Sequence, residues 1–267
     1  ITSSPSVIFK ALGEIRLERG LYYAASLSDP QARFKELNSL AEAAIEDKKR
    51  AEKSDIYVQI LSSYVRALKS AANEERWRAV GREFRGLGSG VDSVIVQYNE
   101  LFDDRVPEGL AKSTGKVLGF VAEGIDKYRQ GEFLKRFVAI GDTLVGECVD
   151  SLTSILKSEE LNELIENEAE GLEANYRAYV IATSQMGFSP QISHDREYVE
   201  LVEKMASVKQ LRNKSVSALR SLKNGHRKLA LELAKEGDGE GKGEEVFEDF
   251  RTLSRLALDI TKLVNEL

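Results

Sequence analysis

Residues 193–235, SHDREYVELVEKMASVKQLRNKSVSALRSLKNGHRKLALELAK, predict one long α-helix. Leu219, Leu222 and Leu229 recur at three- and four-residue intervals, and His226 occupies the same row. This spacing places the four side chains on one helix face, as in the seam of a packed helical bundle. A helix of about 40 residues is about 60 Å long, so we expect an elongated molecule.

Prolines mark where helices of this kind begin and break. Pro30, Pro107 and Pro190 divide most of the 267-residue chain into similar thirds. Proline lacks an amide proton and fits the first turn of a helix better than its interior. Asp29, directly before Pro30, and Ser158, directly before two glutamates, are typical N-cap residues. The sequence predicts an all-α fold, an elongated antiparallel helical bundle of about six to seven long helices.

Apolar rows at helical spacing locate the expected helices and their core. The expected inward residues are Ile8, Leu12, Ile15 and either Tyr22 or Tyr23; Phe34, Leu37, Ala41, Ala44 and Ile45; Ile56, Ile60, Leu61, Tyr64, Leu68 and Ala71; Trp77, Val80, Phe84, Leu87, Val91, Val94, Tyr98 and Leu101; Val117, Phe120, Val121 and Ile125; Phe137, Leu144, Cys148, Leu152 and Ile155; and Val246, Phe247, Phe250, Leu253, Leu256, Leu258 and Leu263. The charged stretch 46–55 predicts either a solvated helical face or a short break near Ser54 and Asp55. Residues 237–243, GDGEGKG, predict a flexible linker within a single domain spanning residues 1–267.

The composition excludes several classes of protein. Hydrophobic residues at 42% and charged residues at 31% are typical of a folded globular chain. The net charge of −6 argues against a nucleic-acid-binding protein. No apolar stretch is long enough to predict a membrane span. The first residue is Ile1, which is compatible with a removed signal peptide or an ordinary cloning boundary, and the single cysteine, Cys148, does not decide the compartment.

Two stretches of opposite charge are candidates to pack against each other. No acidic residue lies between positions 204 and 228, and no lysine or arginine lies between positions 158 and 173. The basic ones are Lys204, Lys209, Arg212, Lys214, Arg220, Lys223, Arg227 and Lys228; the acidic ones are Glu159, Glu160, Glu163, Glu166, Glu168, Glu170 and Glu173. If the two helices form a hairpin near residue 189, the stretches lie side by side and pair. The alternative is that the basic stretch is exposed and binds an anionic partner.

Residue types that often form catalytic or binding sites are explained here by structural roles. Cys148 lies in an apolar row and is expected to be a buried core residue. His194 begins a helix, His226 is expected to be a polar core or edge residue, and two separate histidines with one cysteine argue against a transition-metal site. The bases and aromatics of 76–85 are interleaved as in some nucleic-acid surfaces, but Trp77 and Phe84 belong to the core row. The glycine-rich runs 86–90 and 237–243 fit neither a nucleotide-binding loop nor a calcium loop. We therefore predict no catalytic, cofactor-binding or metal-binding residues, and no cofactor.

Two segments resemble a known group of proteins. YVRALKSAANEERW at 64–77 and GLGSGVDSVIVQYNEL at 86–101 are similar to helical, signal-peptide-bearing proteins of Gram-negative bacteria, often classed as lipoproteins of unknown function. The resemblance covers about 40 residues around the second expected hairpin. It implies a periplasmic or envelope-associated location, with any lipid anchor on a segment upstream of Ile1, and it implies no functional residues. A cytoplasmic location is the alternative.

Three functions are compatible with these observations. The first is a non-enzymatic helical scaffold or binding protein of the bacterial cell envelope, with an unknown protein or an anionic surface as its partner and no nucleic acid. The second is a membrane-associating helical module of the curvature-binding or toxin-component type, although the most apolar candidate hairpin, 133–156, contains five charged residues. The third is an enzyme that assembles carboxylates from several helices. The sequence leaves the ligand and the oligomeric state open.

Overall fold

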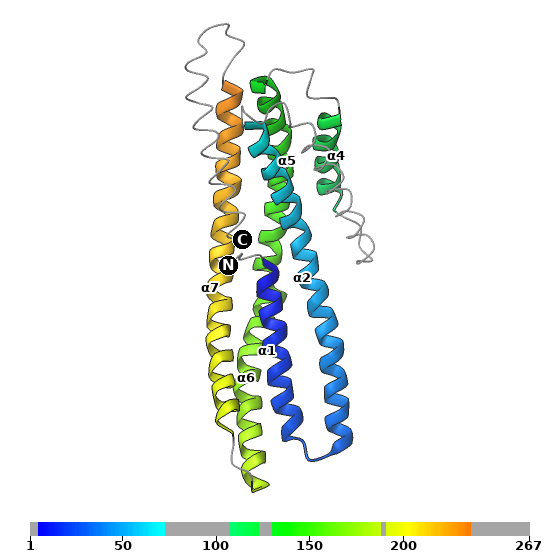
Figure 1. The fold of residues 1–267 in the computed structure, drawn as a ribbon, viewed down its shortest axis with the longest axis vertical. Coiled ribbons are helices and arrows are strands. Elements are labelled where there is room, and N and C mark those ends of the chain that lie inside the picture. Colours follow the sequence, from blue (N-terminus) through cyan, green and yellow to red (C-terminus); the bar gives the residue numbers. More distant parts are fainter. Residues whose placement is uncertain (1–4, 73–106, 123–129, 188–190, 236–267) are drawn as a thin grey trace. The chain divides into compact units, whose positions relative to one another are not determined.

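The computed structural model describes residues 5–72, 107–122, 130–187 and 191–235, and almost all of them are helical, with no strand in these ranges (Figure 1). The helices are α1 (Pro5–Ser26), α2 (Pro30–Ala72), α4 (Glu108–Ala122), α5 (Gln130–Lys157), α6 (Glu159–Gln185) and α7 (Ile192–Lys235). The predicted all-α helical bundle is therefore confirmed. None of the described helices combines the length and apolar character needed to cross a bilayer.

The described residues form two compact units, each with its own core. The α1 unit contains residues 5–54 and 154–215, and the α4 unit contains the described residues of 55–153 and 216–235. Helices α2, α5 and α7 contribute residues to both units. The single domain over residues 1–267 stays a prediction.

Local capping signals define the helix ends in the α1 unit. The Asp29 carboxylate accepts hydrogen bonds from the backbone N–H groups of Gln31 at 3.1 Å and Ala32 at 3.2 Å. The Ser158 hydroxyl accepts one from Leu161 N–H at 3.2 Å, so both predicted N-caps are confirmed. Each cap of this kind stabilises its helix by about 1 kcal/mol. After α6 the chain turns at Gly187, whose φ of 78° favours glycine.

Most of the core of the α1 unit comes from α1, α6 and α7, and Leu40 and Ala51 of α2 add to it. The predicted α1 row is confirmed, since Ile8, Leu12, Ile15 and Tyr22 are buried; Tyr23, the alternative to Tyr22, is exposed. The residues that complete this core are Leu161, Ile165 and Leu172 of α6 and Leu201, Met205 and Val208 of α7.

The predicted inward row of α2 between 34 and 45 is wrong. Phe34 and Ile45 are 63% and 59% exposed, and Leu37, Ala41 and Ala44 are exposed as well. The buried side chains of this part of α2 are Leu40, Asp47, Ala51 and Ser54. The reason is the approach of α1, because α1 meets α2 through Gly20, where any side chain would overlap Leu40. The buried face of α2 is therefore the face around Leu40, which can pack closely against Gly20, and it is not the most apolar face of the helix.

The stretch 46–55 forms a continuous helix. The sequence predicted either a solvated helical face or a break near Ser54. The break is wrong, because α2 continues through residues 46–55 and the Ser54 hydroxyl donates to the Ala51 carbonyl at 2.8 Å. The stretch is not fully solvated either, since Asp47 is buried.

The core of the α4 unit follows the predicted rows closely. All six residues of the 56–71 row are buried, as are Val117 and Phe120 of α4. Phe137, Leu144, Cys148 and Leu152 of α5 are buried too, whereas Val121 is only partly buried, as is Ile155 in the part of α5 that belongs to the α1 unit. Stacked rings connect the helices: the ring centroids of Phe120 and Phe133 are 5.0 Å apart, and those of Tyr64 and Phe137 are also 5.0 Å apart.

Several predictions concern residues outside the described ranges. They are the row from Trp77 to Leu101, the bases and aromatics of 76–85, Ile125, the linker 237–243 and the row from Val246 to Leu263. Most of the residues that carry the resemblance to envelope proteins lie there as well.

Candidate binding groove and buried polar clusters

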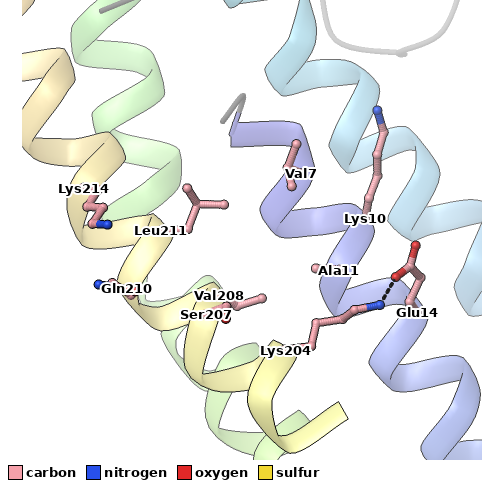
Figure 2. A pocket seen from close by; sticks show the side chains of 10 residues that line it. All are labelled: Val7, Lys10, Ala11, Glu14, Lys204, Ser207, Val208, Gln210, Leu211 and Lys214. Carbon is pink, nitrogen blue, oxygen red and sulfur yellow. Dashed lines mark hydrogen bonds and ion pairs between the residues drawn. The ribbon is translucent and has the colours of Figure 1, made fainter. Parts of the chain in front are cut away.

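A groove runs between α1 and α7 in the α1 unit, with a volume of about 510 Å³ (Figure 2). Its residues are Val7, Lys10, Ala11 and Glu14 of α1 and Lys204, Ser207, Val208, Gln210, Leu211 and Lys214 of α7. Most of these side chains are apolar or small, and the charged ones form its rim.

Both walls of the groove have the spacing of a helical seam. On α7, the lining residues 204, 207, 208, 211 and 214 lie three and four positions apart, and on α1 residues 7, 10, 11 and 14 do the same. Rows of this kind normally hold the side chains of a neighbouring helix. The small residues Ala11 and Ser207 allow that neighbour to approach closely.

The rim of the groove is predominantly basic. It carries Lys10, Lys204 and Lys214 and one acid, Glu14. The Lys204 ammonium group pairs with the Glu14 carboxylate, as the dashed line in Figure 2 shows. Their side chains are 42% and 61% exposed, so this pair contributes little to stability. Lys214 is exposed, and a ligand with negative charge along its edge would complement it.

A buried ionic cluster joins α1, α2 and α6 in the same unit. Arg16 donates from Nε to Glu168 Oε1 at 2.8 Å and from Nη1 to Asp47 Oδ2 at 3.0 Å. Arg19 donates to the other Glu168 oxygen, and its backbone carbonyl accepts a hydrogen bond from Asn175 Nδ2 at 3.0 Å. The Glu168 side chain is only 2% exposed. Burial raises the pKa of Asp47, and the positive charges of Arg16 and Arg50 oppose that rise.

The expected pairing of the acidic stretch 158–173 with the basic stretch 204–228 does not occur. Glu168 pairs with α1, Lys204 pairs with Glu14 of α1, and Lys223 pairs with Asp150 of α5 at 2.6 Å. No ion pair within the described residues joins the two stretches. The end of α6 does lie beside the start of α7, through Tyr176 with Tyr198 and Tyr179 with His194, but the charged residues named above pair with other helices.

A second buried polar cluster lies in the α4 unit. His226 Nδ1 lies 3.0 Å from Asp142 Oδ1, and His226 Nε2 lies 2.8 Å from the Tyr64 hydroxyl. The carboxylate requires a donor, so Nδ1 carries the proton and the Tyr64 hydroxyl donates to Nε2. Both Tyr64 and His226 are fully buried, which confirms His226 as a polar core residue. Burial raises the Tyr64 pKa, and the hydrogen bond to His226 lowers that of Asp142.

The Asp142 bond makes stability depend on pH. The pKa of the Asp142 carboxyl group is lower in the folded chain than its ordinary value of about 4. The bond therefore stabilises the folded chain fully above about pH 4, and this stabilisation is lost as the pH falls through the folded pKa. Asp142→Asn should therefore make urea-unfolding stability fall less steeply between about pH 5 and pH 3 than in the wild type. Asp150→Asn, a change of a largely exposed carboxylate on the same helix, should leave the slope unchanged. Equal slopes for wild type and Asp142→Asn would contradict the role of this bond.

Aromatic side chains hold the α6–α7 turn to α1. The Tyr22 hydroxyl donates to Glu197 at 3.0 Å, and the Tyr179 hydroxyl lies 2.6 Å from Nδ1 of His194, which begins α7 as predicted. Tyr176 and Tyr198 stack with ring centroids 4.2 Å apart. Burial raises the Tyr22 pKa, and the hydrogen bond to Glu197 raises it further. The polar atoms of this cluster bond to one another, which indicates a structural role.

Cys148 is a fully buried thiol, and burial raises its pKa. In the part of the chain that the structure describes, no group of three or more histidine, cysteine or carboxylate side chains could hold a metal ion. Sequence analysis missed the groove and the Arg16–Glu168 cluster. A signal for the cluster was available, because Glu168 occupies the apolar row of Leu161, Ile165 and Leu172.

No family model, curated protein or solved structure matches this chain.

Proposed function

We propose that this chain is a non-enzymatic helical binding protein that acts as a scaffold, and that the α1–α7 groove receives an amphipathic helix of a partner protein. The observation that carries the proposal is the groove itself, with its apolar lining, seam spacing and basic rim. Helix-in-groove recognition uses apolar anchors three and four residues apart, which is the spacing that both walls present. The exposed Lys214 on the rim favours a partner helix with acidic residues beside its apolar row.

The polar clusters support a binding role over a catalytic one. His226 uses both ring nitrogens within the core and is fully buried, so it is not available to a substrate. The Glu168 carboxylate binds two arginines and is nearly inaccessible. These groups stabilise the bundle that holds the groove.

The location in the bacterial cell envelope is part of the same proposal and rests on the similarity of segments 64–77 and 86–101 to envelope proteins. It is tested by fractionating cells that express the full-length native gene product with a C-terminal tag. Recovery in the periplasmic or membrane fraction supports it, and recovery in the cytoplasmic fraction overturns it.

The groove is tested with a synthetic helical peptide that has a leucine seam flanked by glutamates. We expect it to bind the full chain in a fluorescence anisotropy titration, and the same peptide with lysines in place of glutamates to bind far more weakly. Lys214→Glu should weaken binding of the acidic peptide by about tenfold, equivalent to about 1.4 kcal/mol. Lys214 is exposed on the rim, so this change should not affect folding.

The matched control is Lys209→Glu. Lys209 is an exposed lysine of α7 that does not line the groove, so its reversal should change the affinity by less than about twofold. Equal effects of the two reversals, or no binding of the acidic peptide, would refute the groove as the binding site.

A membrane-associating module is the second candidate, favoured by a different observation. Arg220, Arg227 and Lys228 are exposed on α7 within the α4 unit. Exposed bases of this kind attract anionic lipid head groups. Co-sedimentation with vesicles containing phosphatidylserine, and not with neutral vesicles, would support this candidate, and no binding to either would remove it.

A further inference from the structure

The α1–α2 hairpin has an exposed apolar face. On α2, Phe34 is 63% exposed, Leu37 36% and Ile45 59%. On α1, Leu17 and Leu21 are each 39% exposed. Contiguous apolar side chains of this size on a surface usually mark a place where another molecule binds.

The contacts between the two helices show that these residues lie on one side of the hairpin. Gly20 of α1 lies against Leu40 of α2. Successive residues turn an α-helix by about 100° about its axis. Counted from Gly20, Leu17 and Leu21 therefore lie about a quarter turn around α1. Counted from Leu40, the exposed apolar residues of α2 lie about a quarter turn around α2 in the same sense. Because the helices are antiparallel, the same sense of rotation leads to the same side. We name this surface the hairpin face, and it consists of Leu17, Leu21, Phe34, Leu37, Ala41, Ala44 and Ile45.

The α2 row of the hairpin face is complementary to itself. Residues 34, 37, 41 and 44 have the 3-4-3 spacing of a coiled-coil seam and are symmetric about residue 39. A second copy of α2 running antiparallel about that point places Leu37 opposite Ala41 of the second copy. The same operation places Phe34 opposite Ala44 of the second copy. Each large side chain therefore meets a small one, which is how closely packed helix pairs interdigitate.

The α1 residues of the hairpin face fit the same symmetry. Since Gly20 is level with Leu40, Leu21 is level with Ser39, the centre of the α2 row. The two-fold operation thus brings Leu21 next to Leu21 of the second copy. The Leu17 residues of the two copies lie about one helical turn from this point, in opposite directions.

Charge at the ends of the row agrees with this arrangement. The next residue of the α2 row is Lys48, whose side chain is 78% exposed and lies 3.9 Å from the Glu52 carboxylate of the same helix. The two-fold operation puts it level with Asp29 and Pro30 of the second copy. Asp29 is an exposed carboxylate that caps α2, so each end of the interface pairs opposite charges.

We propose that a second copy of this chain packs on the hairpin face, so that two α1–α2 hairpins form an antiparallel four-helix bundle about a two-fold axis near Leu21 and Ser39. A two-fold contact of this type is self-complementary and closes without leaving a free binding surface. It makes the protein a dimer.

Sedimentation equilibrium of the full chain at about 100 µM tests the proposal. The chain mass is 29.7 kDa, and we expect twice that mass. Ala41→Glu should shift the protein to the monomer, because the carboxylate would lie against Leu37 of the second copy. Ala41 is exposed and helical, so the monomeric variant should keep the helical circular dichroism spectrum of the wild type.

Ser39→Glu is the matched control. Ser39 is exposed at the same level of α2, but half a turn away from the row, so this variant should remain a dimer. A monomeric wild type, or a dimer that tolerates Ala41→Glu as well as Ser39→Glu, would overturn the proposal.

Cysteine cross-linking tests the antiparallel register. A mixture of Leu37→Cys and Ala41→Cys chains should form disulfide-linked dimers at least several times faster than either variant alone, because residue 37 faces residue 41 of the other copy. The native Cys148 is fully buried and should not compete. Faster cross-linking of each variant with itself would indicate a parallel pairing and would refute the two-fold arrangement.

Discussion

Replacing Glu168 with alanine should lower the free energy of unfolding by about 3 kcal/mol or more. This carboxylate is 2% exposed and accepts hydrogen bonds from Arg16 and Arg19, whose side chains are 17% and 23% exposed. Its removal leaves Arg19 without its ion-pair partner and Arg16 with Asp47 alone. Losing one member of a buried charge cluster costs more than the cluster contributes, because the remaining charge stays buried without compensation.

Glu173→Ala is the control for this prediction. Glu173 lies on the same helix and pairs with Arg177 at 2.6 Å, but the two side chains are 65% and 70% exposed. Its loss should lower the free energy of unfolding by no more than about 0.5 kcal/mol. Urea unfolding followed by circular dichroism measures both variants. Equal losses of stability would mean that Glu168 is effectively solvated.

Gly141→Ala should destabilise the chain by about 3 kcal/mol, the upper part of the usual range for overpacking a core. A Cβ atom at position 141 would overlap the ring and hydroxyl of Tyr64. The ring cannot move aside easily, because its hydroxyl lies 2.8 Å from His226 Nε2 and its face stacks on Phe137. The close contact between α5 and α2 therefore requires glycine at this position.

Gly146→Ala on the same helix separates this steric effect from helix propensity. Among the residues that the structure describes, nothing but the neighbouring backbone of α5 itself lies within 4 Å of a Cβ at position 146. The alanine should raise stability by up to about 1 kcal/mol, because glycine is the poorer helix former. Thermal unfolding of the two variants should thus shift in opposite directions from the wild type. A shift of Gly141→Ala in the same direction as Gly146→Ala would contradict the packing described around Tyr64.

Local sequence signals predicted the helix starts and the core of the α4 unit. Asp29 and Ser158 cap their helices as expected, because a cap involves only the next two or three residues. The 56–71 row is buried throughout because α2 has only one apolar face in that region. Where one face is clearly more apolar than the others, periodicity is sufficient to predict burial.

Long-range contacts were the part that periodicity could not predict. The apolar row at 34–45 is exposed, because the approach of α1 through Gly20 turns Leu40 inward instead. The charged residues 158–173 and 204–228 do not pair with each other, because Glu168 finds its partners 149 and 152 residues away on α1. No local pattern indicates which of several basic residues a buried carboxylate will meet.

By itself, the sequence determined that this protein is helical, where several of its helices begin and which of their faces are strongly apolar. Those properties depend on backbone hydrogen bonds and on side chains within a few residues of one another. Only the tertiary structure decided which helices adjoin, and hence the α1–α7 groove, the Arg16–Glu168 cluster and the exposed hairpin face. These features depend on where one helix surface can approach another closely, and that is decided by the shapes and charges of residues far apart in the chain.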